Sequence, residues 1–173
     1  MRLKIALIVL FLSCAGCARA AAIAPRSFSV RDALLTEVDF GAAFRARGTP
    51  MSPGQRPEWV RAVWESIDMN SLITQEIIRY VSEEQALQGF MNASEPTKRD
   101  PTPDWDTGVL NAGRFGFAFK VYSDGFLCEF HAQYSEYRLL LAISNRNDGP
   151  LTKRDCHRLI EIVDARLARL IKP

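Results

Sequence analysis

The sequence contains few of the residues on which most catalytic and metal sites depend. Its 173 residues include two histidines and four cysteines, and two of those cysteines stand within the first 17 residues. A structural zinc site takes four ligands, so two histidines cannot fill one alone. The sequence also lacks a Walker A loop and the patterns Gly-x-Ser-x-Gly, His-Glu-x-x-His and Gly-x-Gly-x-x-Gly. These absences predict no cofactor and favour a non-enzymatic protein.

An excess of charge of either sign is also lacking. The chain has 22 Lys and Arg against 20 Asp and Glu, a formal net charge of +2. Two of the basic residues, Arg2 and Lys4, stand in a segment that we expect to be removed, which leaves a nearly neutral protein. A protein that binds nucleic acid needs a basic face, so we expect no nucleic-acid partner.

No apolar run is long enough to span a bilayer, which takes about 20 residues. The run at 5–12 has eight apolar residues, and it lies between the basic start of the chain and small residues at 13–16. This order is typical of a secretory signal peptide. We therefore predict a signal peptide over residues 1–20 and a single exported domain over residues 21–173.

Two cleavage sites compete at the end of this signal. The tetrapeptide Cys14-Ala15-Gly16-Cys17 resembles the lipobox of bacterial lipoproteins, although the first position is usually leucine. The resemblance implies cleavage before Cys17, lipidation of that cysteine and, because Ala18 follows, a tether to the outer membrane from the periplasm. The alternative is signal-peptidase cleavage after Ala20, which would give a soluble secreted protein.

The exported domain retains two cysteines, Cys128 and Cys156. An even pair in an oxidising compartment favours a disulfide. A loop of this size would contribute about 3–4 kcal/mol through the lost entropy of the unfolded chain. The alternative is a pair of unlinked thiols in the core.

The N-terminal half has patterns that predict a layer of helices. Ser29 and Asp32 suggest a capped helix through residue 38, and apolar residues at helical spacing suggest helices over 57–67 and 70–81. A capping box at Ser82 and Gln85 predicts a further helix to about residue 91.

The C-terminal half changes to a period of two. Apolar residues alternate over 115–121, 126–134 and 139–143, which predicts a three-stranded antiparallel meander. Thr152 and Asp155 then open a last helix whose apolar stripe runs to residue 171. The predicted fold is therefore α+β, with an N-terminal helical layer, a three-stranded antiparallel meander and a C-terminal packing helix.

A long polar stretch over residues 92–113 is the first candidate for a binding surface. Trp105 stands there between Asp104 and Asp106, and a tryptophan in a polar loop either anchors a partner or folds back on the core. With Asp100, these carboxylates could begin a calcium site, but their spacing is not that of an EF-hand. We favour a solvated loop without metal, and we predict that Trp105, Asp104 and Asp106 bind a partner.

His131 and Glu129 are weak candidates for catalysis, because both point to the outer face of the predicted sheet. Glu129 could orient His131 as a base, with a hydroxyl from Ser123 or Ser135 as nucleophile, and this gives the alternative of a periplasmic hydrolase. A solvated histidine and glutamate explain the same pattern. We favour an exported envelope protein that binds another envelope protein as an adaptor, assembly factor or inhibitor of the immunity type.

Overall fold

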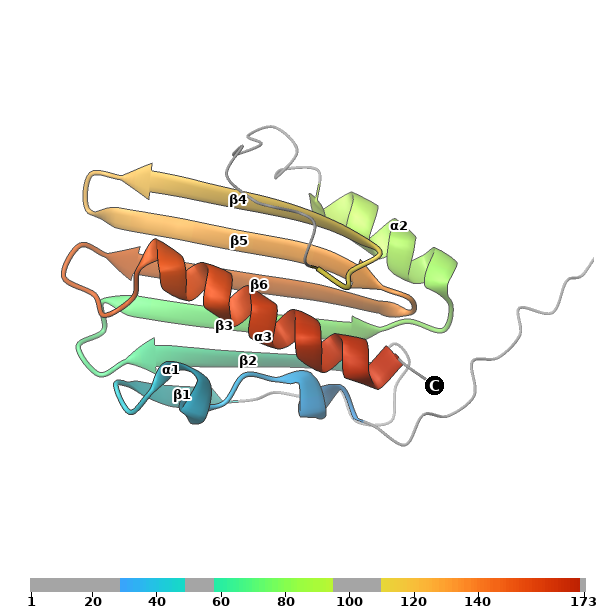
Figure 1. The fold of residues 1–173 in the computed structure, drawn as a ribbon, viewed down its shortest axis with the longest axis horizontal. Coiled ribbons are helices and arrows are strands. Elements are labelled where there is room, and N and C mark those ends of the chain that lie inside the picture. Colours follow the sequence, from blue (N-terminus) through green and yellow to red (C-terminus); the bar gives the residue numbers. More distant parts are fainter. Residues whose placement is uncertain (1–28, 49–57, 95–109, 172–173) are drawn as a thin grey trace, which may run out of the picture.

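A computed structural model describes residues 29–48, 58–94 and 110–171, which form one six-stranded antiparallel sheet (Figure 1). The predicted signal peptide with Cys17, and the segment with Trp105, Asp104, Asp106 and Asp100, lie outside these residues. The strands are arranged in the order β1-β2-β3-β6-β5-β4. Their bounds are β1 Phe44–Gly48, β2 Glu58–Ser66, β3 Ser71–Arg79, β4 Arg114–Tyr122, β5 Gly125–Tyr134 and β6 Tyr137–Arg146.

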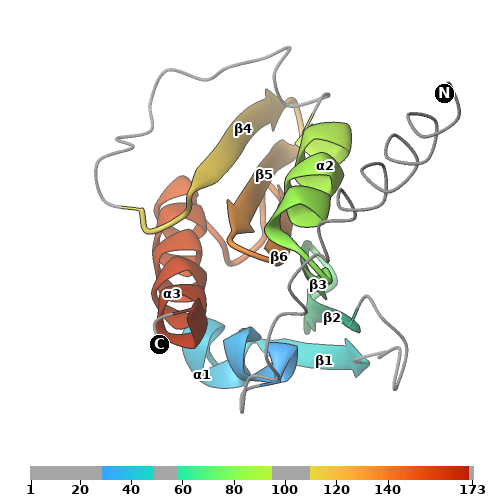
Figure 2. The ribbon, with the colours of Figure 1, turned by 90° about the vertical axis from the view of Figure 1, so that its right-hand side faces the viewer.

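Helices lie on opposite sides of this sheet (Figure 2). The long helix α3 (Lys153–Ile171) covers one side, which we call the closed face. The shorter α2 (Glu83–Ser94) contacts β5 and β6 on the other side, which we call the open face. At about 1.5 Å per residue, α2 is roughly 18 Å long and covers only part of strands that are about 30 Å long. A 3₁₀ turn, η1 (Val30–Ala33), and a one-turn helix, α1 (Glu37–Phe40), both contact α3.

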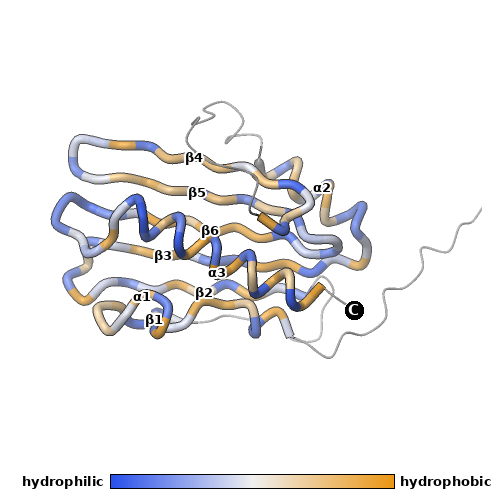
Figure 3. Tube along the Cα trace, viewed as in Figure 1, coloured by the Kyte–Doolittle hydropathy of each residue, from blue (hydrophilic) through white to orange (hydrophobic). Residues whose placement is uncertain are grey.

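The core lies between the closed face and α3. Alternate side chains of the strands point to this face, and cross-strand pairs such as Ile73 with Ile143 and Phe130 with Leu141 are fully buried. The strands are mostly apolar in Figure 3, whereas the turns are mostly hydrophilic. The stripe that α3 contributes consists of fully buried side chains: Cys156, Leu159, Ile160, Val163 and Leu167.

The predicted helices over 57–67 and 70–81 are wrong, because these segments form β2 and β3. Buried and exposed positions alternate along β2 and β3 in the structure, but apolar and polar residues do not alternate in the same way in the sequence. On β2, Trp59 and Val63 add apolar residues to the open face, so that both faces look apolar. On β3, a polar residue, Gln75, occupies one of the fully buried inward positions, where its side-chain amide accepts from Leu35 N at 2.7 Å and donates to Ala33 O at 3.0 Å.

The helix predicted from Ser29 is also wrong in its extent. Ser29 and Asp32 do form a capping box, but it opens only the four residues of η1. A second capping box, at Thr36 and Asp39, opens α1. Of the N-terminal helical layer of the predicted fold, the described residues retain the helix that begins near Ser82, whereas η1 and α1 lie beside β1 and β2 in place of the longer helices.

The C-terminal half is predicted more accurately. The structure confirms the helix that begins near Ser82, where Gln85 N donates to the Ser82 hydroxyl at 3.2 Å, and the last helix after its Thr152–Asp155 capping box. The three strands of the meander lie where the period of two places them. They form only half of the sheet, since β3 pairs with β6 and brings β2 and β1 with it, so the predicted three-stranded sheet is wrong.

Candidate functional site

His131 and Glu129 do lie on the open face, as their parity on β5 predicts. His131, however, is only 9% exposed and Glu129 is half-buried. The helix α2 covers this part of the face, and the neighbouring residue of β4 is Gly116, which has no side chain. The expectation of a fully solvated histidine and glutamate is therefore not met.

Burial lowers the pKa of His131 below its ordinary value of 6.5. The positive charge of Arg138 lowers this pKa further, while Glu76 acts in the opposite direction. Arg138 and Glu76 form an ion pair with each other. Burial is therefore the main cause of the lowered pKa of His131, this pair adds a smaller effect, and the imidazole is neutral at neutral pH.

Neither proposed nucleophile lies near His131. Ser135 stands four residues further along the chain, roughly 13 Å away at the rise of a strand, in the turn between β5 and β6. Ser123 lies in the turn before β5, roughly 20 Å from His131. A general base must lie within hydrogen-bond reach of the proton that it takes, so neither hydroxyl can be activated by this imidazole.

Cys128 and Cys156 are brought together between β5 and α3. Both are fully buried and both carry free thiols in the structure. The pKa of the Cys128 thiol is raised, first by its hydrogen bond with Cys156 and then by burial. The sequence placed both sulfurs in the layer between sheet and helix, and the structure confirms that layer. The disulfide itself stays a prediction.

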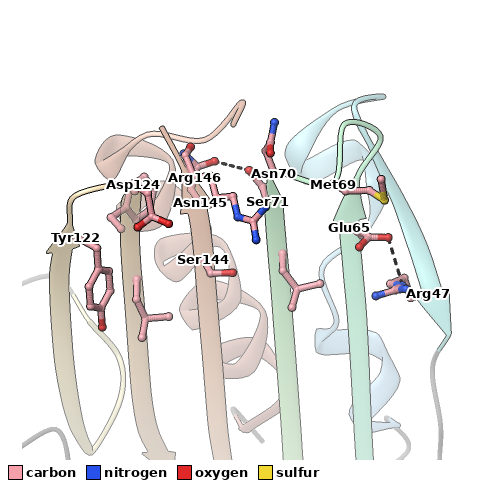
Figure 4. A pocket seen from close by; sticks show the side chains of 14 residues that line it. Arg47, Glu65, Met69, Asn70, Ser71, Tyr122, Asp124, Ser144, Asn145 and Arg146 are labelled. Carbon is pink, nitrogen blue, oxygen red and sulfur yellow. Dashed lines mark hydrogen bonds and ion pairs between the residues drawn. The ribbon is translucent and has the colours of Figure 1, made fainter. Parts of the chain in front are cut away.

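A hollow lies on the open face, at the end of the sheet away from α2 (Figure 4). It is a shallow depression of about 430 Å³ across β3, β6 and β5. We call it the tip depression. Its lining residues are Arg47, Glu65, Met69, Asn70, Ser71, Leu72, Tyr122, Asp124, Gly125, Phe126, Leu127, Ser144, Asn145 and Arg146.

Strand register explains the floor of the tip depression. Ser144 on β6 pairs with Leu72 on one side and with Leu127 on the other, so the three side chains lie in one row across the open face. The two leucines are half-buried and the serine is exposed. Met69 and Tyr122 stand at the two sides of this row (Figure 4).

The turn between β2 and β3 places Met69 at the depression. Asp68 accepts from the Ser66 hydroxyl at 2.5 Å and from Asn70 N at 3.1 Å, which holds the turn closed. Met69 then takes a left-handed conformation with φ of 59°, which is uncommon for a residue with a side chain. Its side chain remains 66% exposed. Strain of this kind is often found at functional positions.

A buried asparagine supports the depression from below. The side-chain oxygen Oδ1 of Asn145 accepts from the Ser71 hydroxyl and, at 3.1 Å, from Leu151 N, and its side-chain Nδ2 donates to Arg146 O at 2.7 Å. These bonds join β3, β6 and the segment that leads to α3. Two glycines allow the backbone to pass close to Asn145. A Cβ on Gly125 would lie 2.0 Å from Asn145 O, and one on Gly149 would lie 2.3 Å from Asn145 Oδ1.

Charges of both signs surround the depression. Glu65 pairs with Arg47 at 3.3 Å and with Arg45 at 3.7 Å. Arg146 forms no ion pair among the residues that the structure describes. Its side chain extends between β6 and β3 above the floor (Figure 4), so one guanidinium is available to a ligand.

Exposed apolar side chains gather at this same end of the sheet. Ile67 and Met69 are each 66% exposed on the turn between β2 and β3, and Val121 and Tyr122 are 75% and 51% exposed at the end of β4. Large exposed apolar side chains that gather in one place mark interaction surfaces more often than isolated ones do.

Sequence reasoning missed this site because its residues come from six strands and two turns. The prediction of helices over 57–67 and 70–81 removed Glu65 and Leu72 from the sheet altogether. One signal was present, since Leu127 is the single apolar residue among the outward positions of β5, beside Glu129, His131 and Gln133. A single apolar residue on an outward face that is otherwise polar indicates a binding surface, and here it marks the floor of the tip depression.

Comparisons with known proteins give little further information. No protein family matches the chain, and no curated protein matches it by sequence. The extracellular domain of PknH from Mycobacterium tuberculosis aligns over 79% of this chain and 93% of its own, with a TM-score of 0.46 and 9% identity. An uncharacterised protein from Mycobacterium smegmatis aligns over 76% and 93%, with a TM-score of 0.41 and 11% identity. None of the described helices is both long and apolar enough to cross a bilayer.

Proposed function

We propose that this protein is an exported module of the bacterial cell envelope that binds another protein through the tip depression. The observation that carries the proposal is the half-covered sheet: α3, with η1 and α1, covers most of one face, whereas the other face has an apolar floor with exposed apolar side chains at its end. An apolar centre within a polar, charged rim is the usual anatomy of a protein–protein interface.

Three features favour a protein partner over a small-molecule substrate. The depression is shallow and open, whereas most ligand pockets enclose much of their ligand. Met69 offers a flexible, polarizable side chain, and Tyr122 offers an aromatic one, as adaptable interfaces often do. The hydrolase alternative finds no support, because His131 is buried and neither Ser123 nor Ser135 is within its reach.

Export rests on the N-terminal residues of the sequence. We propose that residues 1–20 direct the chain across the inner membrane and that lipidated Cys17 tethers it to the outer membrane. The first described residues then begin beside the start of β2, where Val30 N donates to Glu58 at 3.5 Å. The tip depression lies at the other end of β2, away from the first described residues.

Site-specific photo-crosslinking in the envelope tests this function. A photoreactive amino acid at Tyr122 is expected to give one discrete cross-linked product with another protein. The same group at Glu161, which is exposed on α3, is the matched control and is expected to give none.

A third position, Trp105, tests the surface that the sequence predicted. A product from Trp105 together with none from Tyr122 would move the interface to the polar loop. No product from either position would overturn the proposal of a protein-binding module.

A further inference from the structure

We propose that the tip depression recognises an aliphatic side chain paired with a carboxylate on the partner protein. This inference rests on the proposed function and adds the chemistry of the partner. It is carried by the juxtaposition of an apolar floor, Leu72 and Leu127, with the available guanidinium of Arg146.

The floor fits one aliphatic side chain. Leu72 and Leu127 lie on either side of Ser144. The flexible side chain of Met69, beside this row, can adapt to the shape of the bound side chain. Arg146, Asp124 and Asn70 bound this small apolar area at the tip of the sheet. Toward α2, the next row of the open face carries Thr74, Ala142 and Glu129, which offer little apolar surface to a longer alkyl chain. The size of the floor therefore favours a side chain over the tail of a lipid.

Arg146 supplies the preference for a carboxylate. Its guanidinium carries five donors in a planar arrangement that matches the two oxygens of a carboxylate. The exposed hydroxyl of Ser144, two residues before Arg146 and on the same face of β6, offers a second donor to the same group. A hydrogen bond between two charged groups is roughly twice as strong as one between neutral groups.

The other charges of the depression limit what can bind. Glu65 is already paired with Arg47 and Arg45. Asp124 is exposed in the turn before Gly125, whose cross-strand partner is Arg146. Its negative charge disfavours a partner with several carboxylates, so the preferred partner surface carries one acidic group beside its aliphatic anchor.

Titration of the 15N-labelled protein with N-acetyl-leucine and with N-acetyl-leucinamide isolates the carboxylate, because the two probes share the aliphatic side chain. We expect N-acetyl-leucine to shift the amide resonances of Leu72, Leu127 and Ser144 and to bind about fivefold more tightly or better than the amide. Arg146→Gln should abolish this preference. Arg154→Gln, which removes an exposed arginine on α3, should leave it intact.

Several results would overturn this inference. Equal affinity for the two probes, an unchanged preference in Arg146→Gln, or shifts confined to residues outside the depression would each do so. Dodecanoate binding at the same residues more tightly than N-acetyl-leucine would assign the site to a lipid instead. If these probes fail while Tyr122 still cross-links to a protein, the proposed function stands and only the chemistry of the partner is wrong.

Discussion

The closed face and the open face are built from the same strands, yet they differ in almost every physical respect. On the closed face, Ile73, Leu141 and Phe130 are fully buried beneath α3. On the open face, the neighbouring positions carry the Glu76–Arg138 ion pair, the half-buried Leu127 and the exposed Ser144. Burial of apolar surface is the main source of folding stability, so the comparison assigns stability to one face and leaves the other free to bind.

Truncation of one leucine on each face should give the largest contrast. Leu141→Ala removes a fully buried side chain and should lower the free energy of unfolding by about 3–5 kcal/mol. Leu127→Ala, on the floor of the tip depression, should cost about 1 kcal/mol, because this side chain is already partly exposed. Urea denaturation measures both values, and equal costs would contradict the division between the faces.

The predicted disulfide would strengthen the closed face further. Oxidation of Cys128 and Cys156 forms one S–S bond, and the two protons and two electrons pass to a disulfide oxidant such as oxidised glutathione. We expect the oxidised protein to be about 3–4 kcal/mol more stable than the reduced protein. Mass spectrometry of the exported protein detects the bond. Insensitivity of the melting temperature to reductant would contradict the prediction, and Cys128→Ala is the control.

A buried polar network on the closed face should give a smaller effect. The Tyr134 hydroxyl donates to Asp164 Oδ1 at 2.8 Å, and Asn111 donates to the same carboxylate from its backbone and its side chain. Burial, followed by the charge of Asp164, raises the pKa of Tyr134. Tyr134→Phe should cost about 1–2 kcal/mol, because Asn111 still satisfies the carboxylate. A cost below the error of denaturant titration would show that the hydroxyl contributes nothing.

The smallest effect concerns pH and the open face. Because the folded protein holds the pKa of His131 below 6.5, the unfolded chain takes up the proton first as the pH falls. Stability should therefore decrease below about pH 6.5, down to the lowered pKa of the folded state. His131→Gln should remove this part of the pH dependence in melting curves between pH 7 and 5. An identical slope in the variant would assign the effect to other groups.

The success of sequence reasoning differs between the two halves of the sheet. The strands β4 to β6 and α3 could be predicted because their patterns are simple, with Phe117, Cys128 and Leu141 inward and polar residues such as Glu129 outward. The strands β2 and β3 could not, because apolar Trp59 lies on the open face and polar Gln75 lies inward. The tip depression could not be predicted without them, since its floor needs the register between β3 and β6.

The most direct test of the account is a chemical-shift map of the labelled protein titrated with the partner recovered by cross-linking from Tyr122. The account predicts that the largest shifts fall on Met69, Leu72, Leu127 and Ser144, while exposed residues of α3 such as Glu161 and Arg169 do not change. Shifts centred on the outer surface of α3, with the residues of the tip depression unchanged, would contradict it.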